Sequence, residues 1–271
     1  VLAKRFKALE MRSDRAVGVN MYPNMTEEPL ERREEDTPKL KKEREAAVAA
    51  YVADIDTNYL AGKLAAVETV EGTIEAFSNG ATIGQVAAAS CKAEAPETVE
   101  AIAAHHWTER YEALRFDTED YVKKTGKNVE VFLCNMGPIP QHKARADFST
   151  SFLQVGEFNV HLNNGFQDDE GKPGSRYEKC VEALKAGIDE NGTPYDVAVI
   201  CSTDATYPED VPALAPMIKA ANPNITLFLA GAAPKDLEPV YKEAGVDDFI
   251  SVKANCFQTL KMLQKKKGMI E

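Results

Sequence analysis

The residues best suited to chemistry lie in one loop, NMGPIPQHK (135–143), between an apolar run and an amphipathic segment. The apolar run VEVFLC (129–134) predicts a strand, and the segment after the loop predicts a helix that ends near Gly156. A strand, a loop and a helix in this order often form a ligand site, because the loop lies at the carboxyl end of the strand. Gln141 and His142 lie in this loop, but neither is expected to hold a metal or a cofactor. The neutral amide of Gln141 is a weak metal ligand, and His142 comes one residue later, so its side chain should point about 100° away.

The chain from residue 126 onward alternates strand and helix patterns five times, which predicts a parallel sheet. The predicted strands are Val129–Cys134, Asn159–Leu162, Val197–Cys201, Thr226–Ala230 and Asp248–Val252. The predicted helices are Gln141–Val155, Gly174–Gly187, Pro208–Ala221, Pro234–Ala244 and Asn255–Lys267. This order indicates an α/β fold with a flavodoxin-like, five-stranded, doubly wound sheet. The loop NMGPIPQHK should then meet the loop STDATYPED (202–210) at the carboxyl ends of the first and third strands.

Three segments are predicted: 1–39, 40–125 and 126–271. In the first, RAVGVNMYPN (15–24) predicts one isolated strand, which needs a sheet partner from elsewhere because a lone strand leaves its backbone groups unpaired. A charged linker with two prolines follows it. The chain begins at Val1 in the middle of a helical pattern, so we expect a fragment of a longer protein.

The second segment, 40–125, is helical by pattern and rich in Ala, Glu and Lys, which favour helices. A break is expected near Asp56, and Thr82 with Gln85 predicts a capping box. A further helix is expected to start at Pro96 and to carry His105 and His106 on a partly buried face. Adjacent histidines point about 100° apart on a helix, so this pair is not expected to hold a metal.

The net charge of −11 disfavours nucleic acid as a partner, because neutralising phosphates requires a basic patch. The run Lys265–Lys267 more plausibly offsets the negative end of the last helix. No apolar run approaches the roughly 20 residues needed to cross a bilayer, and no signal peptide is evident, so we expect a cytoplasmic protein. The five cysteines lack paired spacing, so we interpret them as reduced core thiols rather than disulfides or a zinc site.

The loop after the first strand resembles that of the cobalamin-binding domain of methylmalonyl-CoA mutase. Catalytic members carry Asp-x-His-x-x-Gly after a Met-Gly pair. Aligning Met136-Gly137 with that pair places Ile139 on the Asp, Gln141 on the His and Ala144 on the Gly. The resemblance implies that the His binds cobalt, the Asp orients that His, and the Gly makes room for the nucleotide tail of the cofactor.

The other loops keep only part of the family pattern. Ser202-Thr203 matches a Ser-Thr pair that meets the cofactor tail in catalytic members, and Gly231 is what remains of a Gly-Gly turn. Lys253 to Asn255 stand where the family has a Gly-rich stretch. We therefore expect no catalytic residue, no metal and no cofactor bound by this chain, with Ser202, Thr203 and Gly231 as residual candidates for contact with a tail.

This pattern resembles the small, non-catalytic subunit of heterodimeric bacterial methylmalonyl-CoA mutases. The resemblance implies an end of a truncated barrel with its linker (1–39), a helical connector (40–125) and a degenerate cobalamin-binding-like domain (126–271). It also implies a structural role in an isomerase of propionate metabolism. The partner would be a large catalytic subunit, which holds adenosylcobalamin and converts methylmalonyl-CoA to succinyl-CoA.

Two alternatives fit the same fold. A corrinoid carrier could bind cobalamin with the cofactor's own base on cobalt, supported by Ser202 and Gly231. A receiver domain shares the strand order and would use Lys253, but it needs an acidic pair after the first strand, where this chain has CNMG. No GxGxxG follows any predicted strand, which disfavours a nucleotide-binding dehydrogenase.

Overall fold

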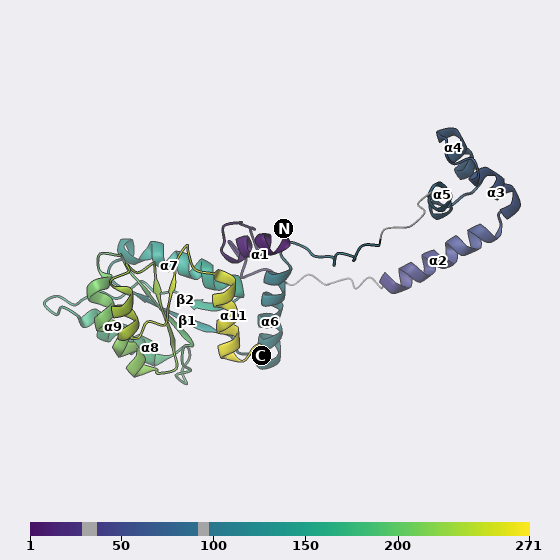
Figure 1. Ribbon diagram of the computed structural model, residues 1–271. Coiled ribbons are helices and arrows are strands. Elements are labelled where there is room, and N and C mark those ends of the chain that lie inside the picture. The colour runs from purple at the N-terminus through teal and green to yellow at the C-terminus, as the bar shows by residue number, and fades with distance from the viewer. Residues whose placement is uncertain (29–36, 92–97) are drawn as a thin grey trace. The chain divides into compact units, whose positions relative to one another are not determined.

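The computed structural model describes residues 1–28, 37–91 and 98–271. Its centre is a parallel sheet of five strands in the order β2-β1-β3-β4-β5 (Figure 1), which confirms the predicted flavodoxin-like fold. The strands are β1 (Glu130–Asn135), β2 (Asn159–His161), β3 (Val197–Cys201), β4 (Thr226–Ala230) and β5 (Asp248–Ile250). The predicted bounds of β3 and β4 agree with the structure. β1 is shifted by one residue at both ends, and β2 and β5 end one and two residues earlier than predicted.

Helices cover both faces of the sheet because successive strand residues point to opposite sides. The helices are α7 (Ile139–Leu153), α8 (Ser175–Ala186), α9 (Tyr207–Ala221), α10 (Glu238–Ala244) and α11 (Cys256–Lys267), and the 3₁₀ turn η1 (Gln154–Gly156) follows α7. Val131 and Leu133 face a core shared with α7 and α11, whereas Phe132 and Cys134 face a core shared with α8 and α9. The sheet therefore separates two hydrophobic cores.

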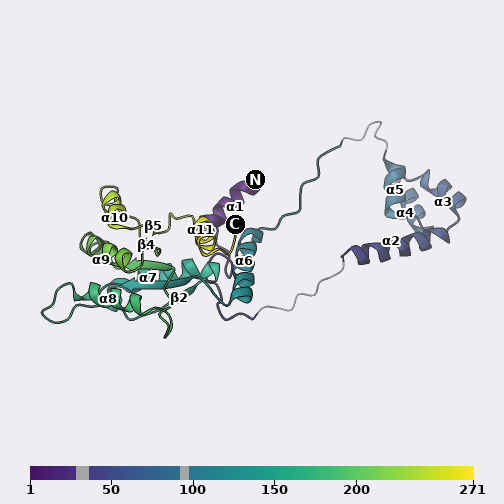
Figure 2. The same cartoon turned by 90° about the horizontal axis from the view of Figure 1, so that it is seen from below.

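The N-terminal segment packs on the first of these cores. Helix α1 (Leu2–Glu10) buries Leu9, and helix α6 (Glu109–Thr125) buries Tyr111 and Leu114 in the same cluster. The side-chain amide of Gln264 in α11 donates to the carbonyl of Leu114 at 2.6 Å. Helices α6 and α11 accordingly lie side by side in both views (Figures 1 and 2).

The prediction of a strand in RAVGVNMYPN is wrong, because these residues form a tight turn. The backbone N–H groups of Val19 and Asn20 both donate to the carbonyl of Ala16, and Gly18 takes a left-handed φ of 77°. The buried side chain of Asn20 accepts from the Ala16 N–H at 2.8 Å and donates to the Leu9 carbonyl at 2.9 Å. These side-chain bonds replace the ladder that a strand would need.

The helix predicted to start at Pro96 also requires correction. Pro96 lies outside the described residues, and 98–106 are not helical, so α6 begins only at Glu109. His105 and His106 precede the helix and are exposed rather than on a partly buried face; they contact Glu109 at 2.9 Å and Glu112 at 2.8 Å. Such contacts place carboxylates in the first turn of α6, where the helix dipole favours them.

The chain divides into two compact units, one of Val1–Glu27 with Ala104–Glu271 and the other of Glu28–Ala103. The second unit contains α2 (Thr37–Ala53), α3 (Thr57–Leu64), α4 (Val70–Ser78) and α5 (Ile83–Ser90). Its hydrophobic cluster consists of Leu60, Val67, Ala76, Ala81 and Val86. The capping box of Thr82 and Gln85 is confirmed, and Asp56 caps α3 where the break was expected.

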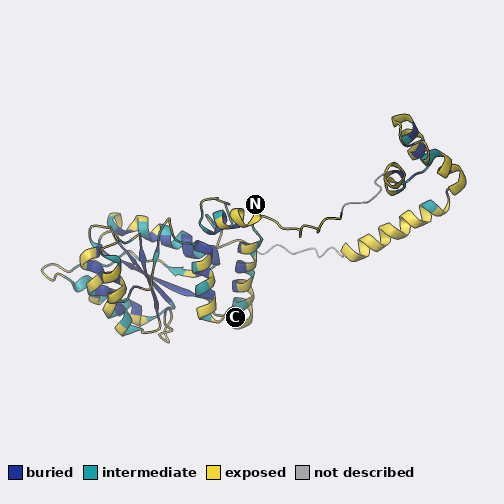
Figure 3. Ribbon diagram, viewed as in Figure 1, coloured by how far each residue is buried: buried dark blue, intermediate teal, exposed yellow. Residues whose placement is uncertain are grey.

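Helix α2 buries none of its residues, and Figure 3 shows it exposed along most of its length. Its apolar side chains Leu40, Val48 and Tyr51 are exposed, as are Val70 and Ile74 of α4. Among the described residues, no helix combines the length and the hydrophobicity that crossing a bilayer requires.

Candidate functional site

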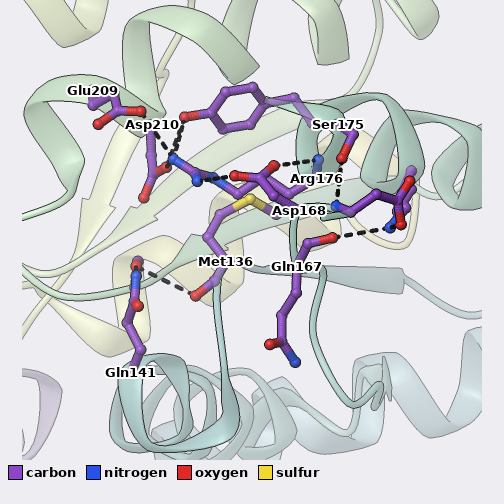
Figure 4. A network of polar contacts seen from close by, with 12 residues as sticks. Met136, Gln141, Gln167, Asp168, Ser175, Arg176, Glu209 and Asp210 are labelled. Carbon is purple, nitrogen blue, oxygen red and sulfur yellow. Dashed lines mark hydrogen bonds and ion pairs between the residues drawn. The ribbon is translucent and has the colours of Figure 1, made fainter. Parts of the chain in front are cut away.

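The loops after β1 and β3 meet at the carboxyl edge of the sheet, as the strand order predicts. The Met136 N–H donates to the carbonyl of Cys201 at 2.9 Å, which extends the pairing of the two strands into their loops. The side-chain amide of Gln141, at the start of α7, donates to the Ser202 hydroxyl at 2.8 Å. Figure 4 shows Gln141 beside Met136 at this edge. Parallel α/β sheets place their ligand sites here.

Gln141 fills the space next to the loop backbone. Gly137 has φ +81°, and a Cβ built there would lie 2.5 Å from the Gln141 Oε1 atom. The hydroxyl of Ser202, which is fully buried, also contacts the Thr206 hydroxyl at 2.7 Å and the Met136 carbonyl at 3.4 Å. The chain's own groups therefore surround Ser202, one of the residual candidates for contact with a cofactor.

His142 does not join Gln141 at Ser202 but packs against the loops that follow β1 and β2. It is buried, and its Nδ1 atom lies 3.1 Å from the carbonyl oxygen of Gly137. A Cβ at Gly165 would meet its ring, so the imidazole packs against that loop. Ile139 and Ala144 are both exposed. The structure thus brings Gln141 into the site and leaves Ile139, His142 and Ala144 outside it.

Gly231, after β4, lies beneath a guanidinium group. A Cβ at this glycine would be 3.1 Å from the Nη1 atom of Arg145, which projects from α7. Arg145 is held there by an ion pair with Asp204 at 2.8 Å. Thr203 is exposed, and its carbonyl accepts from the Thr206 N–H at 3.1 Å, which helps to start α9. The space above Gly231 is thus occupied by a side chain of this protein.

A depression of about 350 Å³ opens beside Gln141. It is lined by Gly137, Pro138, Gln141, Gln167, Asp168, Arg176, Thr206 and Glu209. Its most polar wall is the network around Arg176 (Figure 4), which the sequence analysis did not identify. Its two acidic partners from α9, Glu209 and Asp210, lie more than 30 residues from this arginine in the sequence. No local sequence pattern therefore predicts the cluster.

Arg176 binds three carboxylates: Asp168 at 2.6 Å, Asp210 at 3.0 Å and Glu209 at 3.1 Å. Burial lowers the pKa of Arg176, but the hydrogen bond to Tyr177 and the charges of Asp210 and Asp168 outweigh it, so the pKa is raised. Burial, together with a hydrogen bond to Asp210, raises the pKa of Tyr177 to about 12. Both groups keep their protons at neutral pH, so the network ties the start of α8 to α9 rather than exchanging protons.

The described residues contain no group of three or more His, Cys, Asp or Glu side chains that could hold a metal ion. All five cysteines are free thiols, but only four are buried; Cys91 is exposed, which corrects the prediction that all lie in the core. Burial raises the pKa of Cys134 and Cys201, and that of Cys256 to about 12. These three thiols therefore stay protonated and are poor ligands or nucleophiles.

The chain also matches known proteins. The family model described as methylmalonyl-CoA mutase matches residues 1–95. The chain is 30% identical over 159 residues to the methylmalonyl-CoA mutase small subunit of Porphyromonas gingivalis. The chain is thus similar to methylmalonyl-CoA mutases over part of its length. It is also 28% identical over 158 residues to the probable methylmalonyl-CoA mutase small subunit of Mycobacterium bovis.

These matches cover only part of each methylmalonyl-CoA mutase small subunit. The Porphyromonas match involves 59% of this chain and 22% of the relative, and the Mycobacterium match involves 58% and 23%. The match to the methylmalonyl-CoA mutase family model ends at residue 95, so it covers α1 to α5 but not the sheet. The position-by-position alignment of the loop that follows β1 therefore stays a prediction.

Proposed function

We propose that this chain is part of the small subunit of a heterodimeric methylmalonyl-CoA mutase and has a structural or assembly role. The large subunit would be its partner and would carry out the isomerisation of methylmalonyl-CoA to succinyl-CoA with adenosylcobalamin, which supplies the radical chemistry. In this proposal the three segments 1–39, 40–125 and 126–271 are a barrel end, a connector and a degenerate cofactor domain.

The hydrogen bond between Gln141 and Ser202 is the observation that carries the non-catalytic part of this proposal. A cobalt ligand has to present a free donor atom, and imidazole suits this better than a neutral amide. Here the amide nitrogen of Gln141 is committed to Ser202, and its oxygen packs on Gly137. Arg145 adds a second obstacle by covering Gly231. The residues present do not fit cobalamin, so we derive no catalytic step through it.

Exposed apolar side chains of the helical unit support an assembly role. Val48 and Tyr51 of α2 are exposed on one side of the helix, and Val52 and Ala53 line a largely apolar depression with Val48. Exposed apolar stripes on helices commonly bury themselves against another protein. The relatives are named small subunits, which points to a large subunit as the protein that covers these faces.

Titrating the purified chain with cobalamin and recording absorbance tests the degenerate site. We expect no spectral change and no cobalamin retained on gel filtration. A spectrum with the cofactor base displaced by a protein histidine would contradict the proposal. Binding with the cofactor's own base still on cobalt would favour the alternative of a corrinoid carrier, for which the small residues Ser202 and Gly231 are the support.

Co-purification with the cognate large subunit tests the assembly role. Val48→Asp should abolish capture, because it places a charge in the depression that Val48 lines together with Val52 and Ala53. Ala50→Asp is the matched control, since residue 50 is also exposed but points about 200° away around the helix. Equal capture of both variants, or no capture of the unchanged chain, would argue against this role.

A further inference from the structure

A second depression lies at the opposite, amino edge of the sheet. It has a volume of about 250 Å³ and lies where β1, β3 and β4 begin. It is lined by Val129, Pro194, Tyr195, Asp196, Val197, Asn222, Asn224, Thr226, Leu263, Lys266 and Lys267. Two lysines from the end of α11 face a single carboxylate there, so this small region has an excess of one positive charge in a chain whose net charge is −11.

The two lysines have different partners. Lys267 neutralises Asp196, with its Nζ atom 2.8 Å and 2.7 Å from the two carboxylate oxygens. Lys266 instead donates to the hydroxyl of Thr226 at 3.1 Å, and it has no carboxylate partner within the residues that the structure describes. The positive charge of Lys266 is therefore not offset by a charge within the depression.

Two further donors beside Lys266 are unused. Thr226 is 2% exposed, and its hydroxyl accepts from Lys266, while the hydroxyl hydrogen has no acceptor among residues 1–28, 37–91 and 98–271. Asn224 is exposed, and its side-chain amide has no protein partner in those ranges, whereas Asn222 already donates to the Tyr195 carbonyl at 3.1 Å. The Thr226 hydroxyl keeps its hydrogen for a further bond, so a ligand that accepts hydrogen bonds would find donors from both side chains in this depression.

The helix dipole does not account for this geometry. Basic residues in the last turn of α11 offset its negative end, and the exposed Lys265 and Lys266 can both do so. That effect does not require Lys266 to bond to the first residue of β4 or to line a depression together with Asn224 and Thr226. A charged group and neighbouring donors that line one depression are what an oxyanion requires.

We propose that this depression binds a phosphate group through the ammonium of Lys266, the hydroxyl of Thr226 and the side-chain amide of Asn224. The phosphate is either free or part of a small monoester, since both present the same acceptor oxygens. Lys267 contributes by neutralising Asp196, which would otherwise repel the anion. This site lies at the edge of the sheet opposite to Gln141 and is independent of the function proposed above.

The test is a titration of the ¹⁵N-labelled chain with inorganic phosphate at constant ionic strength, followed by amide chemical shifts. Shifts should saturate and be confined to residues around Asn224, Thr226 and the end of α11, while chloride at the same ionic strength produces none. A second titration with glycerol phosphate distinguishes the sources: saturation with both assigns a monoester or free phosphate, and saturation with phosphate alone assigns the free ion.

Two variants and one control make the result specific. Lys266→Gln and Thr226→Val should each weaken phosphate binding, the first by about tenfold or more because a charge-assisted hydrogen bond is lost. Lys265→Gln removes the same charge from the neighbouring position and should leave the affinity within about twofold. Amide spectra of each variant show whether it is folded. Equal loss in Lys265→Gln and Lys266→Gln, or no saturable shift in the unchanged chain, would overturn the proposal.

Discussion

The side-chain amide of Gln141 donates to the hydroxyl of Ser202 across 2.8 Å and so joins α7 to the loop after β3. Ser202 is fully buried, and its other neighbours are the Thr206 hydroxyl and the Met136 carbonyl. A residue that stands in the position of a cofactor ligand by resemblance thus makes a structural hydrogen bond. The contact gives the edge of the sheet a stability that a vacant ligand site would lack.

Gln141→Ala should lower the free energy of unfolding by about 1 kcal/mol, because it removes one hydrogen bond to a buried hydroxyl. Urea denaturation followed by circular dichroism measures the change. Gln167→Ala is the control, since Gln167 lines the same depression but is exposed, and it should shift the stability by less than about 0.5 kcal/mol. A smaller loss for Gln141→Ala than for Gln167→Ala would contradict the structural role of this bond.

Restoring the family pattern should not by itself restore cobalamin binding. We expect the variant Ile139→Asp/Gln141→His/Ala144→Gly to remain without a cobalamin spectrum, because Arg145 still covers Gly231. Adding Arg145→Ala should open that space and allow binding, which absorbance detects as displacement of the cofactor base by histidine. If the first variant binds cobalamin as well as the second, Arg145 is not an obstacle.

Arg176→Met should destabilise the chain by about 3–5 kcal/mol, because it leaves the buried carboxylate of Asp210 without its cation. The double variant Arg176→Met/Asp210→Leu should recover much of this loss, since both charges are then absent. Lys179→Met is the control: its ion pair with Asp169 is exposed, and such pairs contribute about 0–1 kcal/mol. Thermal unfolding of these proteins and of the single variant Asp210→Leu gives the comparison, and additive effects of the two single changes would contradict the coupling.

The stability of the chain should depend on pH through Glu157. Burial raises its pKa in the folded protein, and the attraction of Arg115 at 3.3 Å only partly opposes this. A carboxyl whose pKa is higher when folded favours folding at low pH, and this contribution is lost as pH rises from the unfolded pKa through the folded one. Glu157→Gln should therefore be more favourable, relative to the unchanged chain, at pH 7 than at pH 4. Urea denaturation at the two pH values measures this difference, and the opposite sign would contradict it.

The sequence predicted the sheet well and the turns poorly. The strands β3 and β4 are short, continuous apolar runs buried on both faces, so composition alone marks their ends. The turn at Val17 to Met21 was mistaken for a strand because its apolar residues look like one, whereas the decisive interactions come from the side chain of Asn20. Those bonds depend on α1, which the local pattern does not contain.

The strand order predicted where the candidate site lies, but it did not predict which side chains form it. Strand order alone placed Gln141 near Ser202, since the loops after β1 and β3 share an edge in this fold. The network around Arg176 was missed because its carboxylates come from the loop after β2 and from α9. The sequence also did not predict that Arg145 covers Gly231, because this depends on the direction of the Arg145 side chain and not on a motif.

Cys91, at the end of α5, is exposed and gives the helical unit a site for selective chemical labelling. The other four thiols are buried, so a maleimide dye at modest concentration should react with Cys91 first and leave the sheet unlabelled. A fluorophore there would report when another protein covers the helices, through its anisotropy or its accessibility to a quencher. The chain thus supports a direct, solution-based readout of docking without any engineered cysteine.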